Sequence, residues 1–436
     1  MKQKLLKSTF YLIFFSIIAK TLSFLVRIML ARFLNPEAMN LYALVSPTLV
    51  FVIALAQMGI PAALSKVIAQ QQLSFKPMIA SIIISIVNNL IVIALYLLLI
   101  PMMAKLILKQ PQTEEILKSI LPMIPLVTLS GLLKGYLQGK QEHVIACSSQ
   151  LFEEIFRIGY LLFAFSKGGN DPIQSARIAM FSVAVGECGS ALYMFLFCMR
   201  SCQVTLPFSL KIDKQIYQQL LSISIPMTSS RLIGSFSHFL EPIIIMSSLD
   251  DASALVESYG ILNGYLMPLL TLPSFLTVTL GAFLLPAFTY QIAHHHEHKA
   301  SQILWGLLSL SLVIGSGVGV ICYFFPHQLL NLFYHQAIGA AELKKLSLPF
   351  ILFATQPILS NALYALNKNK GSMVDTLIGS LLRLSIIYFL AEKLQKKTIY
   401  IAVTLSMLTT TFMHLFRVIK ALASSKNTSH SSAIKQ

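Results

Sequence analysis

Residues 8–34 read STFYLIFFSIIAKTLSFLVRIMLARFL and form the first long apolar run of the chain. A membrane-spanning helix needs about 20 apolar residues, so this run is long enough to cross a bilayer. It nevertheless carries Lys20 and Arg27 within the span and Arg32 at its far end, and it contains no acidic residue. Lys20 and Arg27 are seven residues apart, which places them on one face of a helix.

Two cations inside one span are costly, because a lysine or arginine at the bilayer centre costs about 2.5–3.5 kcal/mol on insertion scales. We therefore expect Lys20 and Arg27 to face a polar cavity. The alternative is that each side chain extends towards a membrane interface, which is easier for Arg27 than for Lys20.

The composition is that of a membrane protein. Of the 436 residues, 56% are hydrophobic and only 11% are charged, and the mean hydropathy is +0.73. Soluble domains have about 25% charged residues. The net charge of +16 favours contact with anionic membrane lipid. We expect no nucleic-acid partner, because no loop is long enough to form a binding module.

Twelve apolar runs predict an all-α polytopic membrane protein with about twelve transmembrane helices. An even number of spans puts both termini on one side, and the distribution of Lys and Arg favours the cytoplasmic side for both. The acidic connection at 247–258, SSLDDASALVES, is accordingly expected outside. The runs cover approximately 8–32, 41–64, 78–101, 116–137, 144–166, 177–199, 217–240, 259–283, 302–325, 345–366, 372–391 and 399–420.

The two halves of the chain resemble each other. The fourth and fifth runs align with the tenth and eleventh, and the first aligns with the seventh. We predict two parallel six-helix repeats, with the substrate site between them. The expected parts are an N-terminal lobe at 1–200, a cytoplasmic linker at 201–216, a C-terminal lobe at 217–420 and a disordered tail at 421–436. The matched pairs are Pro122 with Pro349, Lys140 with Lys368, Arg157 with Arg383, Lys20 with Arg231 and Arg27 with His238.

The seventh run carries the next candidate residues. Arg231 and His238 have the same spacing as Lys20 and Arg27, so both helices are expected to line one cationic cavity. Glu241 follows His238 by one turn and is expected to pair with it. The alternative is that Arg231 hydrogen-bonds to carbonyl groups and that His238 is a packing residue.

Two further arginines have acids on the same helix. Glu153 and Glu154 precede Arg157 by about one turn, which predicts a structural ion pair. Asp375 lies two turns before Arg383, and we expect it to play a similar part there.

Glu187, in AVGECGSALY (184–193), is a candidate for a proton or sodium site. The alternative is that it holds neighbouring helices together. Glu241 is a second candidate for ion coupling. Histidines in the run AHHHEHK (293–299) have no partner cluster, so we expect no metal and no cofactor.

Prolines are expected to kink four of the spans, because proline removes an intrahelical hydrogen bond. In a transporter such sites absorb bending; the alternative is static curvature. The prolines are Pro47, Pro61, Pro122, Pro125, Pro268, Pro273, Pro349 and Pro357.

Three segments resemble the polysaccharide transporters of the stage V sporulation protein B group. They are LARFLNPEAMNLYALVSPTLVFVIALAQMGIPAALSKVIAQ (30–70), ISIPMTSSRLIGSFSHFLEPIIIMSSL (223–249) and YGILNGYLMPLLTLPSFLTVTLGAFLLPAFTYQIA (259–293). This group is part of the multidrug/oligosaccharidyl-lipid/polysaccharide (MOP) exporter superfamily, together with the lipid II flippases. The resemblance covers about 1–420 and implies two lobes in a V, alternating access, and movement of an undecaprenyl-diphosphate-linked saccharide.

The resemblance also implies that basic residues of the first helix serve the substrate cavity, which here are Lys20, Arg27 and Arg32. It suggests wall-synthesis proteins as partners. Many relatives have fourteen spans, whereas we find twelve, so the groove for the lipid tail differs.

The leading hypothesis is therefore a flippase for a lipid-linked saccharide in the bacterial cytoplasmic membrane. A diphosphate suits a cavity with Lys20, Arg27 and Arg231, because arginine binds its oxygens in pairs. The alternative is a multidrug cation antiporter of the same superfamily, which needs an acid in the membrane, such as Glu187 or Glu241. A membrane ligase and a non-transporting scaffold are less favoured; no catalytic pattern is present, so we do not expect an enzyme.

Overall fold

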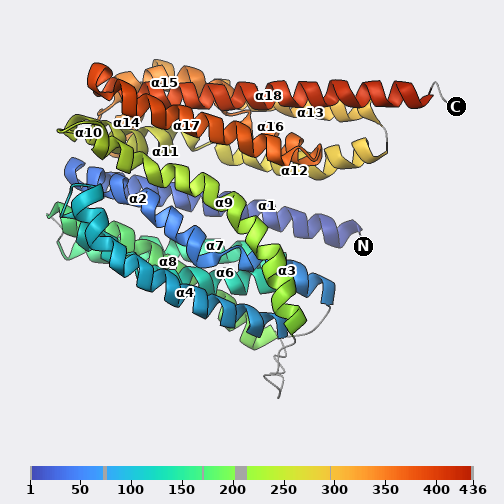
Figure 1. Cartoon of the computed structure of the whole chain (residues 1–436), viewed down its shortest axis with the longest axis horizontal. Helices are drawn as coiled ribbons and strands as arrows, with labels where there is room; N and C mark the ends of the chain where they lie inside the picture. The colour runs from blue at the N-terminus through green and yellow to red at the C-terminus, as the bar shows by residue number, and fades with distance from the viewer. Residues whose placement is uncertain (1, 72–75, 169–170, 202–213, 295, 434–436) are drawn as a thin grey trace. The chain divides into compact units, whose positions relative to one another are not determined.

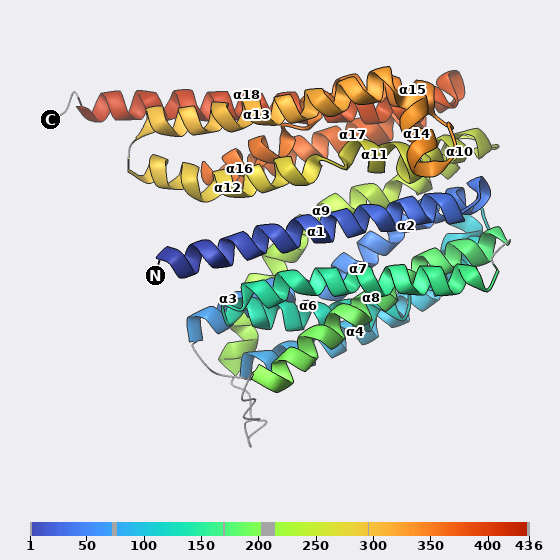
Figure 2. The same cartoon turned by 180° about the vertical axis from the view of Figure 1, so that it is seen from behind.

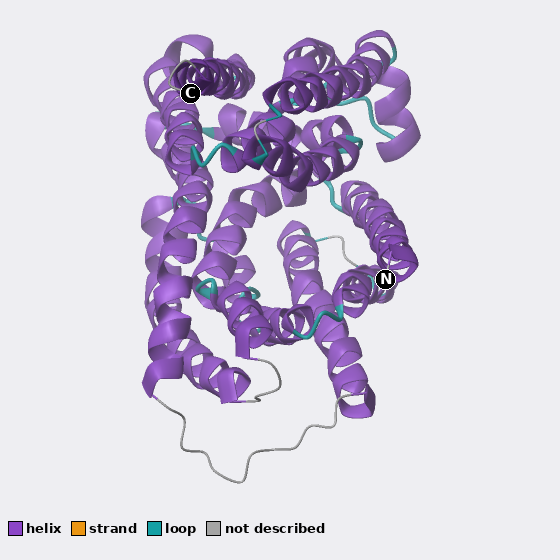
Figure 3. Cartoon of the chain, turned by 90° about the vertical axis from the view of Figure 1, so that its right-hand side faces the viewer, coloured by secondary structure: helices purple, strands orange, loops and turns teal. Residues whose placement is uncertain are grey.

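The described residues of the computed structural model are 2–71, 76–168, 171–201, 214–294 and 296–433, and within these ranges the chain forms helices and loops without a β-strand (Figure 3). The all-α class predicted from the apolar runs is confirmed. Contacts between residues divide the chain into two compact units, Met1–Met246 and Ser247–Gln436.

The first unit contains the helices α1 to α9 (Figure 1). Its closest helix pairs are α7 with α8, α1 with α7, and α3 with α6, and the first two pairs are visible side by side in Figure 2. The helices are α1 (Lys2–Phe33), α2 (Pro36–Gln57), α3 (Ile60–Gln71), α4 (Lys76–Met102) with the π-helical turn η1 (Met103–Ile107), α5 (Thr113–Lys118), α6 (Met123–Gly139), α7 (His143–Ser166), α8 (Pro172–Ser201) and α9 (Lys214–Ser248).

The second unit contains the helices α10 to α18. Its closest pairs are α17 with α18, α12 with α16, and α13 with α15. The helices are α10 (Ser253–Ile261), the π-helical turn η2 (Leu262–Leu266), α11 (Met267–Thr271), α12 (Ser274–Ala293), α13 (Glu297–Phe324), α14 (Pro326–Tyr334), α15 (Ala340–Phe353), α16 (Gln356–Ala365), α17 (Asn369–Leu394) and α18 (Lys397–Ala433).

Four of the predicted spans are broken near their prolines. The second run divides into α2 and α3, because Met58 and Gly59 turn the chain at φ angles of 45° and 63° just before Pro61. The eighth run bends by 60° between residues 253–271 and 274–281, at Pro273. The fourth run divides into α5 and α6 just before Met123, and the tenth into α15 and α16.

The number of spans agrees with the sequence once α7 and α9 are included. Among the described residues, nine helices are long and apolar enough to cross a membrane, or ten if the bent pair is one span. The helices α7 and α9 correspond to the fifth and seventh predicted runs. Every window of 18 residues in α7 includes the three charges of Glu153, Glu154 and Arg157, so α7 carries more charge than the other spans.

The division into units differs from the predicted lobe boundaries at one helix. We expected the seventh run to begin the second lobe, whereas α9 packs within the first unit. Ser224 of α9 donates a hydrogen bond to the Met58 carbonyl over 2.8 Å, and the Phe51 ring stacks on Phe239 at 4.9 Å. Most of the predicted linker, residues 202–213, lies outside the described residues.

The end of the chain also differs from the expected disordered tail. The helix α18 continues past Ala421 to Ala433. The extension is rich in serine, which has low helix propensity, so we attribute its helix to continuation of the membrane-spanning part, where the helix is already nucleated.

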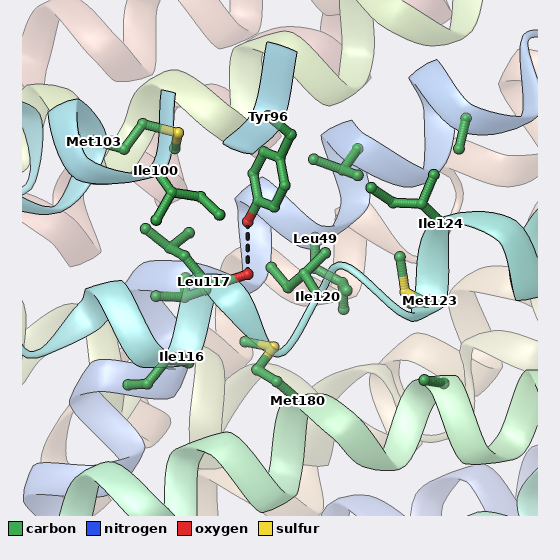
Figure 4. Packing of buried hydrophobic residues seen from close by; sticks show 14 of the residues in the cluster. Leu49, Tyr96, Ile100, Met103, Ile116, Leu117, Ile120, Met123, Ile124 and Met180 are labelled. Carbon is green, nitrogen blue, oxygen red and sulfur yellow. Dashed lines mark hydrogen bonds between the residues drawn. The ribbon is translucent and has the colours of Figure 1, made fainter. Parts of the chain in front are cut away.

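The core of the first unit joins α2, α4, α5, α6 and α8 (Figure 4). Leu49, Ile120 and Met180 pack together there with other buried apolar side chains. The Tyr96 hydroxyl donates a hydrogen bond to the Leu117 carbonyl over 3.1 Å, where α5 approaches its end. The same carbonyl also accepts a hydrogen bond from the Ile120 amide over 3.1 Å, so the tyrosine adds a second bond at this helix end.

Candidate functional site

The cations of α1 lie beside the stripe that packs on α7. Ala19, Val26 and Leu30 are buried, whereas Lys20 and Arg27, each directly next to a buried residue, are exposed. Helix geometry thus places the two cations along one flank of the packed stripe, as their spacing predicts. Among the described residues, neither Lys20 nor Arg27 forms a side-chain hydrogen bond or an ion pair.

The far end of α1 is held by aromatic contact. The Phe33 ring stacks on Phe165 of α7 with 4.8 Å between the ring centroids. Arg32, directly before Phe33, is exposed. An apolar contact therefore helps to fix the far end of α1 along α7.

The predicted partners on α9 are in contact. His238 Nδ1 lies 2.9 Å from Glu241 Oε1, and the Glu241 side chain is only 5% exposed, against 58% for His238. The pairing expected from their spacing is confirmed. Arg231 lies on the same helix, but its side chain is outside the described part of the structure.

A group of charged side chains lies between α6, α7 and α8, where the sequence predicted only one ion pair. Arg157 Nη1 lies 3.6 Å from Glu154 Oε2, and both side chains are largely buried, so that predicted pair is confirmed. On the neighbouring helix α8, Glu187 accepts a hydrogen bond from the Ser130 hydroxyl of α6. The acid that the sequence singled out on α8 is thus bound to α6 by a direct contact.

Glycines on α8 allow this close approach. A Cβ atom on Gly186 would lie 2.5 Å from Arg157 Cγ and 2.9 Å from the Glu153 carbonyl oxygen. A Cβ atom on Gly189 would lie 2.4 Å from the Phe156 ring. Small residues let membrane helices approach closely, and here they place the Arg157 side chain directly beside the turn that carries Glu187.

Two lysines complete this group, and sequence reasoning missed one of them. Lys134 of α6 acts electrostatically on both Glu153 and Glu187, and Lys20 of α1 acts on Glu153. Glu153 and Glu187 also act on each other. Lys134 stands in an apolar run, SGLLKGYLQG (130–139), and a lysine within a span is itself a signal of a polar partner.

In the second unit, the ion pair predicted between Asp375 and Arg383 is wrong. Asp375 does not act as the counter-ion expected for Arg383; it is fully buried and binds Arg417 of α18 in a bidentate ion pair, at 2.6 and 3.0 Å. The buried His414 contributes Nε2 at 4.0 Å from Asp375 and 3.2 Å from the Ser372 hydroxyl. Spacing along one helix does not indicate this partner, because Arg417 lies on the adjacent helix.

No cluster of three or more metal-ligating side chains occurs among the described residues. His294 and His296 are exposed and contact Tyr290 and Gln291, while His295 is not described.

Comparisons with known proteins identify the family. Residues 5–292 match the family described as Polysaccharide biosynthesis protein. The chain belongs to this family. This member of the polysaccharide biosynthesis family is 34% identical to the stage V sporulation protein B of Bacillus subtilis, over 97% of this chain and 85% of that protein. It is 23% identical to the lipid II flippase MurJ of the same organism, over 88% of this chain and 77% of MurJ.

Solved structures share the fold of this polysaccharide biosynthesis family member. A multidrug resistance MATE family transporter of the MOP superfamily, in an inward-facing conformation, matches with a TM-score of 0.74 at 15% identity, covering 94% of this chain and 96% of that one. A MOP superfamily transporter from Pyrococcus furiosus matches with a TM-score of 0.64 at 14% identity, covering 96% of each chain. The resemblance to sporulation protein B and the MOP superfamily, expected from the sequence, is confirmed.

Proposed function

We propose that this protein is a flippase that moves a saccharide linked to undecaprenyl diphosphate, or to a similar polyprenyl diphosphate, across the cytoplasmic membrane by alternating access. Its family and its similarity to a lipid II flippase support this substrate class. The fold shared with MOP transporters supports transport. We propose no covalent chemistry, so the protein is a transporter and not an enzyme.

The observation that carries the proposal is the exposure of the two α1 cations and their lack of an ion-pair partner among the described residues. Lys20 and Arg27 are exposed and form no ion pair within the described residues, although they lie inside a span. An unpaired charge in a membrane-spanning segment is costly and marks a substrate or ion pathway. A diphosphate headgroup supplies two phosphates with oxygen acceptors that arginine binds in pairs.

The other predicted substrate residues have supporting roles in this proposal. Arg32 lies at the end of α1 and Arg231 on α9, and we propose that both residues bind the headgroup or the sugar. His238 is held by Glu241 through Nδ1, so the orientation of its imidazole ring is fixed. The termini lie on the cytoplasmic side, and the positive charge favours anionic membrane lipid. Wall-synthesis proteins are the partners we propose.

A second candidate, a multidrug cation antiporter, is favoured by one observation. Glu187 lies within a span and is bound to Ser130, and an acid at such a position can carry a coupling ion. Glu241 is already engaged by His238, so Glu187 is the acid that we propose for ion coupling in either function. Drug-cation efflux by purified protein in vesicles, lost in Glu187→Gln, would favour the antiporter.

Native mass spectrometry with a polyprenyl-diphosphate-linked saccharide tests the flippase. We expect the saccharide lipid to bind the wild-type protein and to bind Lys20→Ala, Arg27→Ala and Arg231→Ala about 10- to 100-fold more weakly, because each lost charged hydrogen bond is worth about 1.5–3 kcal/mol. Arg177→Ala is the matched control, since Arg177 is exposed on α8 but already pairs with Glu115 at 2.7 Å. Equal binding by all five proteins would exclude the α1 cations as the headgroup site.

A further inference from the structure

A partly exposed arginine lies at one end of the helix pair α17 and α18. Asp375 Oδ2 and Oδ1 accept hydrogen bonds from Nε and Nη2 of Arg417, at 3.0 and 2.6 Å. An arginine has five N–H donors, and this contact uses two of them. The Nη1 group has no acceptor among the described residues, although 37% of the Arg417 side chain is exposed. A buried carboxylate thus holds one edge of the guanidinium group, and the donors of Nη1 are available to a ligand.

The position of this guanidinium group on α17 is fixed. A Cβ atom on Gly371 would lie 2.5 Å from Arg417 Cδ and 2.9 Å from Nη1, so the group lies directly against the first turn of α17. Beside it, the Ser372 hydroxyl lies 3.2 Å from Nε2 of the buried His414 of α18. A donor group that is already held in one orientation loses little conformational entropy when it binds a ligand.

Further cations stand at the same end of α17. Lys368 and Lys370 flank its first residue, and both are exposed. Neither forms a side-chain hydrogen bond or an ion pair with a described residue. Together with Asp375 and Arg417 they have a formal charge of +2. The other acid in the sequence of α17 and α18, Glu392, is near the opposite end of α17. The charge at this end therefore favours an anion.

The ends of the two spans place these cations at the depth of lipid headgroups. The spans are Asn369–Leu394 and Lys397–Leu422, so the contact lies two residues inside the start of one and five residues before the end of the other. Val374 and Ile378 follow Gly371 on the same face of α17 and are exposed apolar side chains. Basic pockets between membrane helices at the cytoplasmic side bind lipid headgroups.

We propose that Arg417, Lys368 and Lys370 bind the phosphate group of a membrane lipid at the cytoplasmic ends of α17 and α18. The free donors of Nη1 and Nη2 match two phosphate oxygens, and the lysines add electrostatic attraction. Asp375 is the positioning residue of this site. The ligand is an anionic phospholipid or a polyprenyl diphosphate, which share this phosphate chemistry. The site belongs to the second unit and does not use the α1 cations, so it goes beyond the proposed function.

Native mass spectrometry of the full-length protein tests the site with two lipids, phosphatidylglycerol and geranylgeranyl diphosphate. All proteins carry Lys20→Ala and Arg27→Ala, so that the α1 cations do not contribute. Adding Lys368→Ala and Lys370→Ala removes two exposed cations without touching the packed contact of Asp375. We expect one or both lipids to bind about 25-fold more weakly, because each lysine near the membrane surface contributes a factor of about five. Arg417→Lys keeps the charge but loses the paired donors, and should bind about tenfold more weakly.

Lys396→Ala with Lys397→Ala is the matched control, because these lysines stand at the opposite end of the same helices; binding should not change. A loss confined to phosphatidylglycerol assigns the site to an anionic phospholipid, and a loss confined to the diphosphate assigns it to a polyprenyl diphosphate. Unchanged binding of both lipids without Lys368 and Lys370 would overturn the site. Displacement of the lipid by an equal concentration of inorganic phosphate would overturn the lipid assignment. The phosphatidylglycerol result is independent of the proposed flippase function, because this lipid is not its proposed substrate.

Discussion

At the scale of single residues, the two units neutralise their buried acids differently. Glu154 is paired within its own helix, at a distance longer than a hydrogen bond. Asp375 instead accepts two hydrogen bonds from Arg417 on the adjacent helix and is completely buried. Bidentate pairing neutralises the charge and fixes its geometry. The Asp375 carboxylate is therefore occupied by an internal cation and joins α17 to α18.

Removal of Arg417 is expected to destabilise the second unit. Arg417→Ala leaves a buried carboxylate without its partner, and we expect the free energy of unfolding to fall by about 2–3 kcal/mol, below the full cost of a wholly buried pair because Arg417 is 37% exposed. Equilibrium unfolding in mixed micelles measures the change. Lys396→Ala, which breaks the exposed pair with Glu257, is the control, and its effect should stay below about 1 kcal/mol. Similar losses in both variants would contradict the structural role of Arg417.

At the scale of helices, glycines determine how closely α6 approaches α3. A Cβ atom on Gly135 would lie 2.3 Å from the Pro61 carbonyl oxygen, and one on Gly139 would lie 2.8 Å from Ile68 Cβ. The atom that an added Cβ would meet at Gly135 belongs to the backbone, so it cannot move aside by a rotamer change as a side chain would. This contact holds α3 in place directly after the break at Gly59, where the positive φ angle of 63° also favours glycine.

Gly135→Ala should therefore separate α3 from α6 and lower the free energy of unfolding by about 1–3 kcal/mol, as overpacking does in a tight core. Gly159→Ala is the matched control on α7, because nothing lies within 4 Å of its added Cβ atom; its effect should be neutral or slightly stabilising. The same micelle unfolding assay compares them. A Gly135→Ala protein as stable as Gly159→Ala would show that the α3–α6 contact is looser than described.

At the scale of the whole chain, the two units repeat one plan of helix pairing. The helices α3 and α6 pack together in the first unit, and α12 and α16, from the corresponding spans, pack together in the second. The glycine that allows the close contact lies on different helices in the two units. In the first unit it is on α6, and in the second unit it is Gly281 on α12, which faces Pro357. The packing thus agrees with the repeat predicted from sequence, although few residues match.

The predicted orientation of the chain can be tested with single cysteines. In a background without the five native cysteines, Asp251→Cys lies in the acidic loop before α10, and Gln141→Cys lies in the loop between α6 and α7. With both termini in the cytoplasm, a membrane-impermeant maleimide should label Asp251→Cys in intact cells and should label Gln141→Cys only after lysis. The reverse pattern would exclude the cytoplasmic assignment.

The sequence by itself determined the helices and the contacts within them. The apolar runs correspond to the spans, the prolines mark four breaks, and spacing along one helix predicted the pairs His238 with Glu241 and Arg157 with Glu154. These features follow from local geometry, because residues three or four apart on a helix always face each other.

The tertiary structure alone decided which helices meet. It paired Asp375 with Arg417, 42 residues further along the chain, joined Glu187 to Ser130 of another helix, and placed α9 within the first unit. In a membrane most helices present similar apolar surfaces, so association depends on close packing at small residues such as Gly186 and on polar contacts. Those contacts join residues distant in the chain, and no periodicity along a single helix specifies them.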